Sequence, residues 1–384
     1  MNDIAASTTG ALSILRDFYE EVCREENKTL PESGEPLQWI FLLSDNYIEE
    51  REHVRVLVQP DIKKSWKNRL LFDLKDGGRM ITDLKPDVYF SLQNTLTKGI
   101  SCKTVLYVHQ PLGFQRLKRF SFFKQAEREY AVYQYLIARM INRSIRRADK
   151  TIVQTEWMRQ EILRRTHTEP SRVVKIAPDL KLPENMEARE QASPLPGERI
   201  RFFFPSGPIL YKNHDIIVKA CQLLKEQGIT DYAVILTLSE EELTELCPQA
   251  EGLISDGASK QRPLICRGRI PREEVFSLYR DSVLLFPSYI ESFGYPPAEA
   301  RAAGGFVLAT DTEACREVLQ GYERALYFDP FQPEALSALM KQAIRGELPK
   351  ERESRSLSQG RQEGTDDVSG ESRSWQRVIR ELLI

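Results

Sequence analysis

Two glutamates eight positions apart, Glu291 and Glu299, flank the densest set of residues that could bind a charged ligand. Between them stand Gly294, which permits a tight turn, and Pro296 and Pro297, which suit the first turn of a helix. The backbone N–H groups and the dipole at the start of such a helix attract phosphate. The pattern therefore predicts an anion site at a helix N-terminus.

The two glutamates would then lie on either side of a bound phosphate. Glu299 is expected inside the first turn of the helix. There its carboxylate can accept hydrogen bonds from both hydroxyls of a diol such as a ribose. Glu291, before the turn, could bond hydroxyls of a transferred group or stabilise positive charge developing there. The alternative is that Glu299 only caps the helix and Glu291 is solvated, and the spacing alone does not decide between them.

The segments that would position these residues alternate short apolar runs with segments of helical period, which is typical of parallel sheets with crossover helices. Helices are expected at 11–26, 122–147 and 375–384. Strands are expected at 39–43, 53–58, 88–92, 104–108, 151–153, 201–204, 233–238, 264–266, 282–286 and 306–309. We therefore predict an α/β protein with two Rossmann-like, doubly wound domains, whose ligands would bind in the crevice at the carboxyl ends of the strands.

The chain of 384 residues is too long for a single hydrophobic core. The predicted parts are an N-terminal domain (1–177), a linker rich in proline (178–198), a second domain (199–345), and a polar loop followed by a C-terminal helix (346–384). A truncated first strand is expected, because only Met1–Ile4 precede the polar loop that leads into the first helix.

Composition excludes several classes of protein. A net charge of -2 argues against a nucleic-acid binder, and six scattered cysteines without a C-x-x-C pair favour neither a zinc site nor a disulfide framework. No run approaches 18 apolar residues, and the N-terminus does not resemble a secretion signal. A cytoplasmic protein is expected.

The turn resembles a known family. Glu291 and Glu299 match the E-x7-E signature of family 4 retaining glycosyltransferases, and the flanking Phe-Pro-Ser, Ser-Phe-Gly and Glu-Ala match as well. Further similarity lies at Thr8–Ala11, Tyr107–Pro111 and Lys212–His214. The resemblance covers nearly the whole chain. It implies the GT-B fold, with a nucleotide-sugar donor on the C-terminal domain and the acceptor mostly on the N-terminal one.

The resemblance also implies roles for single residues. Glu299 would hold the ribose, Glu291 the donor sugar, and Lys212 the diphosphate. The other donor-binding residues implied are Gly207, Arg267, Ser292, Phe293, Gly294 and Tyr295. His109 would lie near the donor sugar and the reacting centre, so that the expected catalytic residues are His109, Lys212 and Glu291. Thr9, Gly10 and Asn94 are weaker candidates for contacts with the acceptor or a phosphate.

One departure from the family pattern concerns Pro208, which stands where the family usually has an arginine, so that the diphosphate clamp would rest on Lys212 alone. The chain lacks a D-x-D motif, and we expect catalysis without a metal or other cofactor. Two alternatives remain open at this point: a binding subunit that has lost catalysis, and a nucleotide-sugar 2-epimerase.

The segment 115–124 mixes four apolar residues with four cations just beyond His109. It predicts either contact with an anionic membrane surface or an ordinary helix start whose aromatic side chains enter the core. The first interpretation, together with the family resemblance, motivates the hypothesis of a lipid-linked saccharide acceptor in surface polysaccharide synthesis, with the enzyme on the inner face of the membrane.

Overall fold

A computed structural model describes residues 1–6, 9–30, 33–183, 199–255, 262–349 and 374–384. Most of the predicted linker and nearly all of the predicted polar loop at 346–372 lie outside these residues. The chain forms two compact units. Unit 1 holds residues 1–179 together with the C-terminal helix, and unit 2 begins at Leu180.

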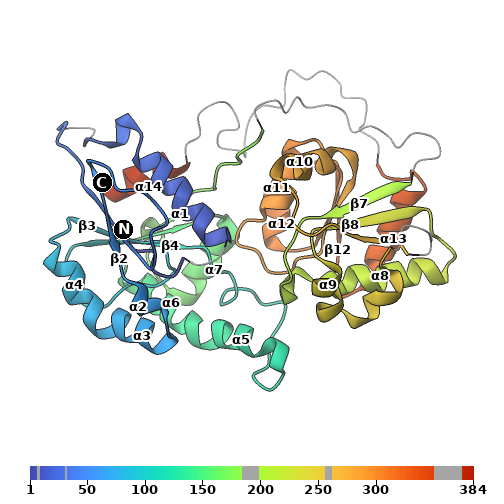
Figure 1. Cartoon of the computed structure of the whole chain (residues 1–384), viewed down its shortest axis with the longest axis horizontal. Coiled ribbons are helices and arrows are strands. Elements are labelled where there is room, and N and C mark those ends of the chain that lie inside the picture. The colour runs from blue at the N-terminus through green and yellow to red at the C-terminus, as the bar shows by residue number, and fades with distance from the viewer. Residues whose placement is uncertain (7–8, 31–32, 184–198, 256–261, 350–373) are drawn as a thin grey trace. The chain divides into compact units, whose positions relative to one another are not determined.

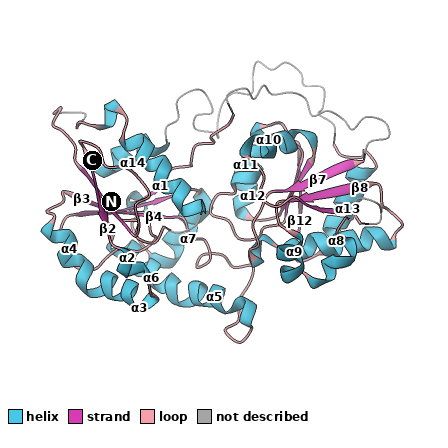
Figure 2. Ribbon diagram, in the orientation of Figure 1, coloured by secondary structure: helices cyan, strands magenta, loops and turns pink. Residues whose placement is uncertain are grey.

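Unit 1 is built on parallel strands with helices packed against them (Figures 1 and 2). Its strands are β1 (Trp39–Leu43), β2 (Val54–Val58), β3 (Val88–Ser91), β4 (Lys103–Val108), β5 (Lys150–Val153) and β6 (Val173–Lys175). Its helices are α1 (Thr9–Val22), α2 (Pro60–Lys63), α3 (Trp66–Leu71), α4 (Gly77–Asp83), α5 (Arg128–Ala131), α6 (Ala138–Arg147), α7 (Glu156–Thr166) and α14 (Ser374–Leu383). Strand β1 pairs with β2, and β3 to β6 pair in chain order.

The first residues of the chain join these two groups of strands. Asn2 forms parallel bridges to Leu42 on β1 and to Ser91 on β3. Its N–H donates to the Phe90 carbonyl at 2.7 Å, and its own carbonyl accepts from Leu92 at 3.1 Å. These first residues therefore occupy the position between β1 and β3.

Helix α14 belongs to unit 1 although it ends the chain. Its apolar side chains Val378, Ile379 and Leu382 are buried, because they join the core formed by α1 and the sheet. The Trp375 ring lies 5.3 Å from Phe18 of α1, which agrees with the adjacent positions of α14 and α1 in Figure 1.

Unit 2 repeats the plan. Its strands are β7 (Ile200–Phe204), β8 (Tyr232–Leu236), β9 (Leu264–Cys266), β10 (Val283–Phe286), β11 (Val307–Thr310) and β12 (Ala325–Phe328), and its helices are α8 (His214–Glu226), α9 (Glu240–Leu246), α10 (Arg272–Asp281), α11 (Tyr295–Ala302), α12 (Glu313–Val318) and α13 (Pro333–Ile344). Among the described residues the strands form one parallel sheet in the order β12-β11-β10-β7-β8-β9. The chain thus runs outward in one direction after β7 and in the other after β10, and the switch point lies between these two strands.

The predicted α/β architecture with two doubly wound domains is confirmed. The helix expected at 122–147 is confirmed from residue 125 onward, because a 3-10 turn (Gln125–Glu127), α5, a π-helical stretch (Val132–Ile137) and α6 follow one another without a break. Only its start is wrong, since residues 122–124 precede the first helical turn. The edge strands β6 and β12 were not predicted, because runs of three or four residues carry too little periodicity.

Candidate active site

An ion pair spans the switch point of unit 2. The loop after β7 ends in a short 3-10 turn, Leu210–Lys212, and the loop after β10 carries Glu291. The Lys212 Nζ lies 2.5 Å from Glu291 Oε1, with side chains 18% and 15% exposed. Since β7 and β10 are neighbours and parallel, their carboxyl ends bring the two loops together, and this is the edge at which such sheets bind ligands.

Further bonds tie the two loops together. Asn213, in the left-handed conformation with φ 63°, donates through Nδ2 to the Pro287 and Pro330 carbonyls at 3.3 and 2.8 Å. The Tyr289 N–H donates to the Tyr211 carbonyl at 3.2 Å. Lys212 and Glu291 therefore extend from loops whose backbones are fixed on both sides.

The turn after β10 has the geometry that its glycine predicts. Gly294 is the N-cap of α11 with φ 94° and ψ 68°, a left-handed conformation that only glycine adopts without strain. Pro296 and Pro297 follow in the first turn of α11. Ser292 and Phe293 lie half-buried before the cap, and Tyr295 begins the helix. The positive end of the α11 dipole therefore lies in the loop that carries Glu291.

Glu299 lies deeper than the sequence suggested. It is the fifth residue of α11, so its expected place inside the first turn is wrong by one position. Only 5% of the residue is exposed. Arg272 Nη2 donates to Glu299 Oε1 at 2.8 Å, and the Tyr279 hydroxyl donates to Oε2 at 3.0 Å. Burial raises the pKa of the Glu299 carboxyl, and Arg272 and Tyr279 oppose that rise.

The two remaining donor-side candidates follow β7 and β9. Gly207 lies after β7, and an added Cβ would meet no atom within 4 Å, so this stretch of loop is open. Arg267 follows β9, its N–H donates to the Leu236 carbonyl, and its side chain pairs with Glu274 at 2.7 Å. Both residues lie at the carboxyl edge of the same sheet as Lys212.

In unit 1 the structure brings Asn94 and His109 into contact. Asn94 follows β3 with φ 64°, and its Oδ1 accepts from the backbone N–H groups of His109 at 2.7 Å and Gln110 at 2.9 Å. Because Oδ1 faces these two N–H groups, the Asn94 atom that lies 3.4 Å from His109 Nε2 is the amide nitrogen Nδ2, which can only donate. Nε2 is therefore the acceptor, and the proton of the neutral ring sits on Nδ1.

Desolvation lowers the pKa of His109 to about 4, which agrees with a neutral imidazole. Among the residues that the structure describes, His109 Nδ1 has no hydrogen-bond partner although the atom is buried. A neutral N–H donor without a partner among the described residues thus lies at the carboxyl edge of the unit 1 sheet, the edge at which parallel sheets bind ligands.

The expectation for Thr9 and Gly10 as loop residues is wrong. Both belong to the first turn of α1, which begins at Thr9, two residues before the predicted start. Gly10 is tolerated there because the first turn lacks the intrahelical bonds that glycine weakens further along.

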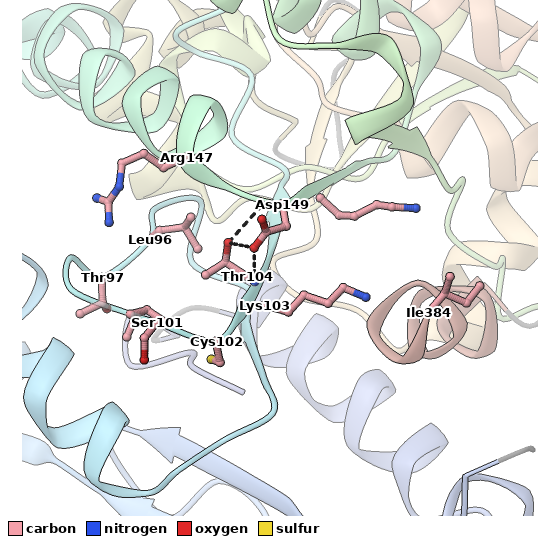
Figure 3. A pocket seen from close by; sticks show the side chains of 11 residues that line it. Leu96, Thr97, Ser101, Cys102, Lys103, Thr104, Arg147, Asp149 and Ile384 are labelled. Atoms are coloured by element: carbon pink, nitrogen blue, oxygen red, sulfur yellow. Dashed lines mark hydrogen bonds between the residues drawn. The ribbon is translucent and has the colours of Figure 1, made fainter. Parts of the chain in front are cut away.

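A separate pocket of about 690 Å³ lies at the amino ends of β4 and β5 (Figure 3). Two of its basic side chains, Lys103 and Lys150, already have partners. Lys103 Nζ donates to the Glu381 and Leu382 carbonyls at 3.1 and 3.0 Å, and Lys150 pairs with Glu381 at 2.5 Å. These bonds hold the last turn of α14 against unit 1, so the pocket is a feature of helix docking and lies at the opposite edge of the sheet from His109.

The described residues offer neither a metal-binding cluster nor a membrane-spanning helix. No three His, Cys, Asp or Glu residues gather there as a metal-binding group. No described helix combines the length and the apolar character that crossing a bilayer requires.

Most of unit 2 is similar to a known family of proteins. Residues 185–361 match the family model described as glycosyl transferases group 1. Unit 2 is therefore similar to the group 1 glycosyl transferases. The Lys212–Glu291 pair, the turn at Gly294 and Glu299 all lie within the matched residues.

The chain also has relatives among curated proteins. The chain is 26% identical over 212 residues to the serotype-specific mannosyltransferase WbdA of Escherichia coli. The match covers 52% of this chain and 25% of WbdA, so the chain spans about a quarter of the length of that relative.

Solved glycosyltransferases share the fold of most of the chain. An α,α-trehalose-phosphate synthase from Burkholderia xenovorans superposes with a TM-score of 0.58 at 11% identity, covering 89% of this chain and 91% of that one. HepE from Anabaena, solved with UDP, gives 0.56 at 14% identity, covering 90% and 89%. WaaG, a glycosyltransferase of lipopolysaccharide biosynthesis, gives 0.52 at 13% identity, covering 80% and 82%. The two-domain GT-B fold expected from the motifs is thereby confirmed.

Sequence reasoning missed two residues of this site in unit 2, Arg272 and Tyr279, which hold the Glu299 carboxylate. They stand seven positions apart on α10, a spacing that places both on one face of the helix. That spacing was the available signal, but nothing in it shows that the face packs against α11.

Proposed function

We propose that this chain is a retaining, metal-independent glycosyltransferase that moves a hexose-type sugar from a nucleotide diphosphate sugar to a saccharide acceptor. The observation that carries the proposal is the Lys212–Glu291 pair at the switch point of unit 2, beside the N-terminus of α11. A cation, a carboxylate and a helix N-terminus together suit a diphosphate joined to a polyhydroxyl group.

Each part of the pair would serve one half of the donor. Lys212 would neutralise the charge that builds on the diphosphate as the bond from the sugar C1 to the phosphate oxygen breaks. Glu291 would accept hydrogen bonds from the hydroxyls of the sugar. Their mutual ion pair keeps both side chains extended toward the crevice before a donor arrives, which lowers the entropy cost of binding.

Retention would follow from attack on the face from which the diphosphate departs. The acceptor oxygen forms the new bond to C1, and its proton passes to the leaving phosphate oxygen. The account needs no protein nucleophile: Glu291 is paired with Lys212, and the buried Glu299 is paired with Arg272. Rate enhancement would come from orientation and from stabilising the departing diphosphate.

In unit 1 we assign His109 to the reacting sugars. Its ring is held by Asn94, and its Nδ1–H would donate to a sugar oxygen without changing protonation state, because its pKa lies far below neutral pH. Neutral donors of this kind orient a substrate.

The acceptor is proposed to be a lipid-linked saccharide of a surface polysaccharide. Within the segment 115–124, one aromatic side chain enters the core and others are exposed, so each of the two interpretations left open by the sequence applies to part of it. Phe120 is buried, whereas Leu117, Phe122 and Phe123 are 46%, 40% and 95% exposed, and Arg119 is exposed among them. Exposed apolar groups beside a cation suit the surface of an anionic membrane.

Incubation of the purified chain with single donors tests the reaction. GDP-mannose is the first to try, because the curated relative is a mannosyltransferase, and UDP-glucose is the second, because a structural neighbour was solved with UDP. Release of the nucleotide that depends on an added saccharide, with an α-linked product from an α-linked donor, supports the proposal. A 2-epimerised nucleotide sugar formed from donor alone would support the epimerase, and binding without turnover would support the inactive subunit.

A further inference from the structure

Arg272 makes three contacts that fix its guanidinium. Its Nη2 donates to Glu299 Oε1 at 2.8 Å and to the Lys181 carbonyl at 2.8 Å, and its Cζ lies 5.1 Å from the centre of the Phe276 ring. The side chain is 54% exposed, so burial alone would not hold it in place. An exposed arginine bound at three points is positioned for a purpose beyond packing.

The Glu299 carboxylate, which Arg272 holds, can accept further hydrogen bonds. An ionised carboxylate offers about four acceptor positions, and two are taken, one on each oxygen, by Arg272 and Tyr279. One position on each oxygen is left, and the two together match the two hydroxyls of a cis-diol. Only the ionised form provides both, since a protonated carboxyl becomes a donor at one oxygen.

We infer that Arg272 is a positioning residue for the nucleotide: it keeps Glu299 ionised and oriented so that both carboxylate oxygens accept the ribose hydroxyls of the donor. This inference rests on the proposed function. Arg272 acts through Glu299, so its removal would change how tightly the donor binds and how that binding depends on pH, with a smaller effect on the chemical step.

The direction of the pH effect follows from the groups around Glu299. Within the described residues the charged and titratable groups that face it are Arg272 and Tyr279, both from α10, while Arg301 on its own helix donates to the Val318 carbonyl. Burial raises the pKa of Glu299, and Arg272 is the one positive charge that opposes the rise. Without Arg272 the carboxyl would take up a proton at a higher pH, and donor affinity would fall as the pH falls.

The experiment measures the dissociation constants of GDP-mannose and UDP-glucose between pH 8.5 and 6.0 by titration calorimetry. The diphosphate diester of a sugar nucleotide does not titrate in this range. We expect the wild-type value to change little, and that of Arg272→Met to weaken about tenfold per pH unit once the pH is below the raised pKa of Glu299. Arg272→Lys should restore the flat profile. Arg280→Met, on the last turn of the same helix, is the matched control, and Arg272→Gln serves if the Met variant does not fold.

A second readout uses donors that lack the 2′-hydroxyl. The wild type should bind the 2′-deoxy donor about tenfold more weakly than the parent donor, and Arg272→Met should show a smaller difference. A flat pH profile in Arg272→Met, or an unchanged penalty for the 2′-deoxy donor, would overturn the inference while leaving the proposed function standing. Failure of the wild type to bind either nucleotide sugar would overturn both.

Discussion

Lys212 Nζ and Glu291 Oε1 lie 2.5 Å apart although 79 residues separate them along the chain. The pair exists because β7 and β10 are adjacent parallel strands and each ends in the loop that carries one partner. Both side chains are mostly shielded from water, so each neutralises the other in the absence of a donor.

Breaking this pair should affect transfer far more than folding. We expect Lys212→Met to lower kcat about 10²- to 10³-fold, because one preorganised charge at the departing diphosphate is lost. The variant should also lose about 1–3 kcal/mol of stability, since Glu291 is left partly buried without its partner. The double variant Lys212→Met with Glu291→Gln should regain most of that stability and remain inactive. Activity returning together with stability would contradict the catalytic assignment.

Replacing Asn94 by aspartate tests the tautomer of His109. The carboxylate can keep the bonds to the backbone N–H groups but cannot donate to Nε2, so it should move the ring proton from Nδ1 to Nε2 and raise the pKa of His109 above about 4. Nitrogen-15 NMR of labelled histidine measures both changes. Asn94→Asp should also reduce transfer, and identical histidine spectra for the two proteins would contradict the geometry.

His214 should make the protein sensitive to mild acid. The residue is 3% exposed, and burial, aided by Lys212, lowers its pKa to about 3. The folded pKa is thus below the unfolded value of about 6.5, so the unfolded chain binds more protons and stability falls as the pH drops through 6.5 toward 3. Between pH 7 and 5 the loss from this residue is about 2 kcal/mol.

Urea unfolding at these two pH values measures the effect. His214→Leu should lessen the difference in unfolding free energy between pH 7 and 5 by that amount. His167→Asn, which removes an exposed histidine from a left-handed position, should leave the difference unchanged. Equal pH dependence in wild type and His214→Leu would show that His214 is not the buried neutral group described.

Gly294→Ala should strain the turn before α11. The backbone has φ 94°, and an added Cβ would meet its nearest atom at 3.8 Å, so the expected cost of about 1–2 kcal/mol comes from conformation rather than from a clash. Gly252→Ala is the control, since that glycine has ordinary φ and open space around it. Thermal unfolding should separate the two variants, and equal midpoints would argue against a left-handed Gly294.

The exposed part of segment 115–124 should bind anionic vesicles. Changing Leu117, Phe123 and Arg119 together to serine should reduce sedimentation with vesicles that contain phosphatidylglycerol, because the exposed apolar area and one cation are removed. Phe331→Ser, an exposed aromatic of unit 2, is the control. Vesicle binding that survives the triple change would place the membrane contact elsewhere or remove it from the account.

The sequence was informative where a residue follows a strand. Lys212 and Glu291 could be expected at one edge of the sheet because apolar runs precede both, and parallel strands end at a common edge. His109 and Asn94 meet for the same reason. Arg272 and Tyr279 could not be found in this way, because the face that α10 presents to α11 is set by how both helices pack on the sheet.

The exact start of a helix and the burial of single aromatic residues also depended on tertiary structure. Glu299 lies one residue beyond the first turn because α11 begins at Tyr295, and Phe120 enters the core while Phe123 stays exposed within the same mixed segment. The hydrophobic pattern does not separate these two aromatic residues, since only the packing of the preceding loop against unit 1 decides which of them is covered.

The most direct test of the central claim is the transfer reaction of the purified chain, followed as release of nucleotide from GDP-mannose or UDP-glucose with and without a saccharide acceptor. We predict release that depends on the acceptor in the wild type and falls at least about 10²-fold in Lys212→Met. Equal release by wild type and Lys212→Met, or none by the wild type with either donor, would contradict the account.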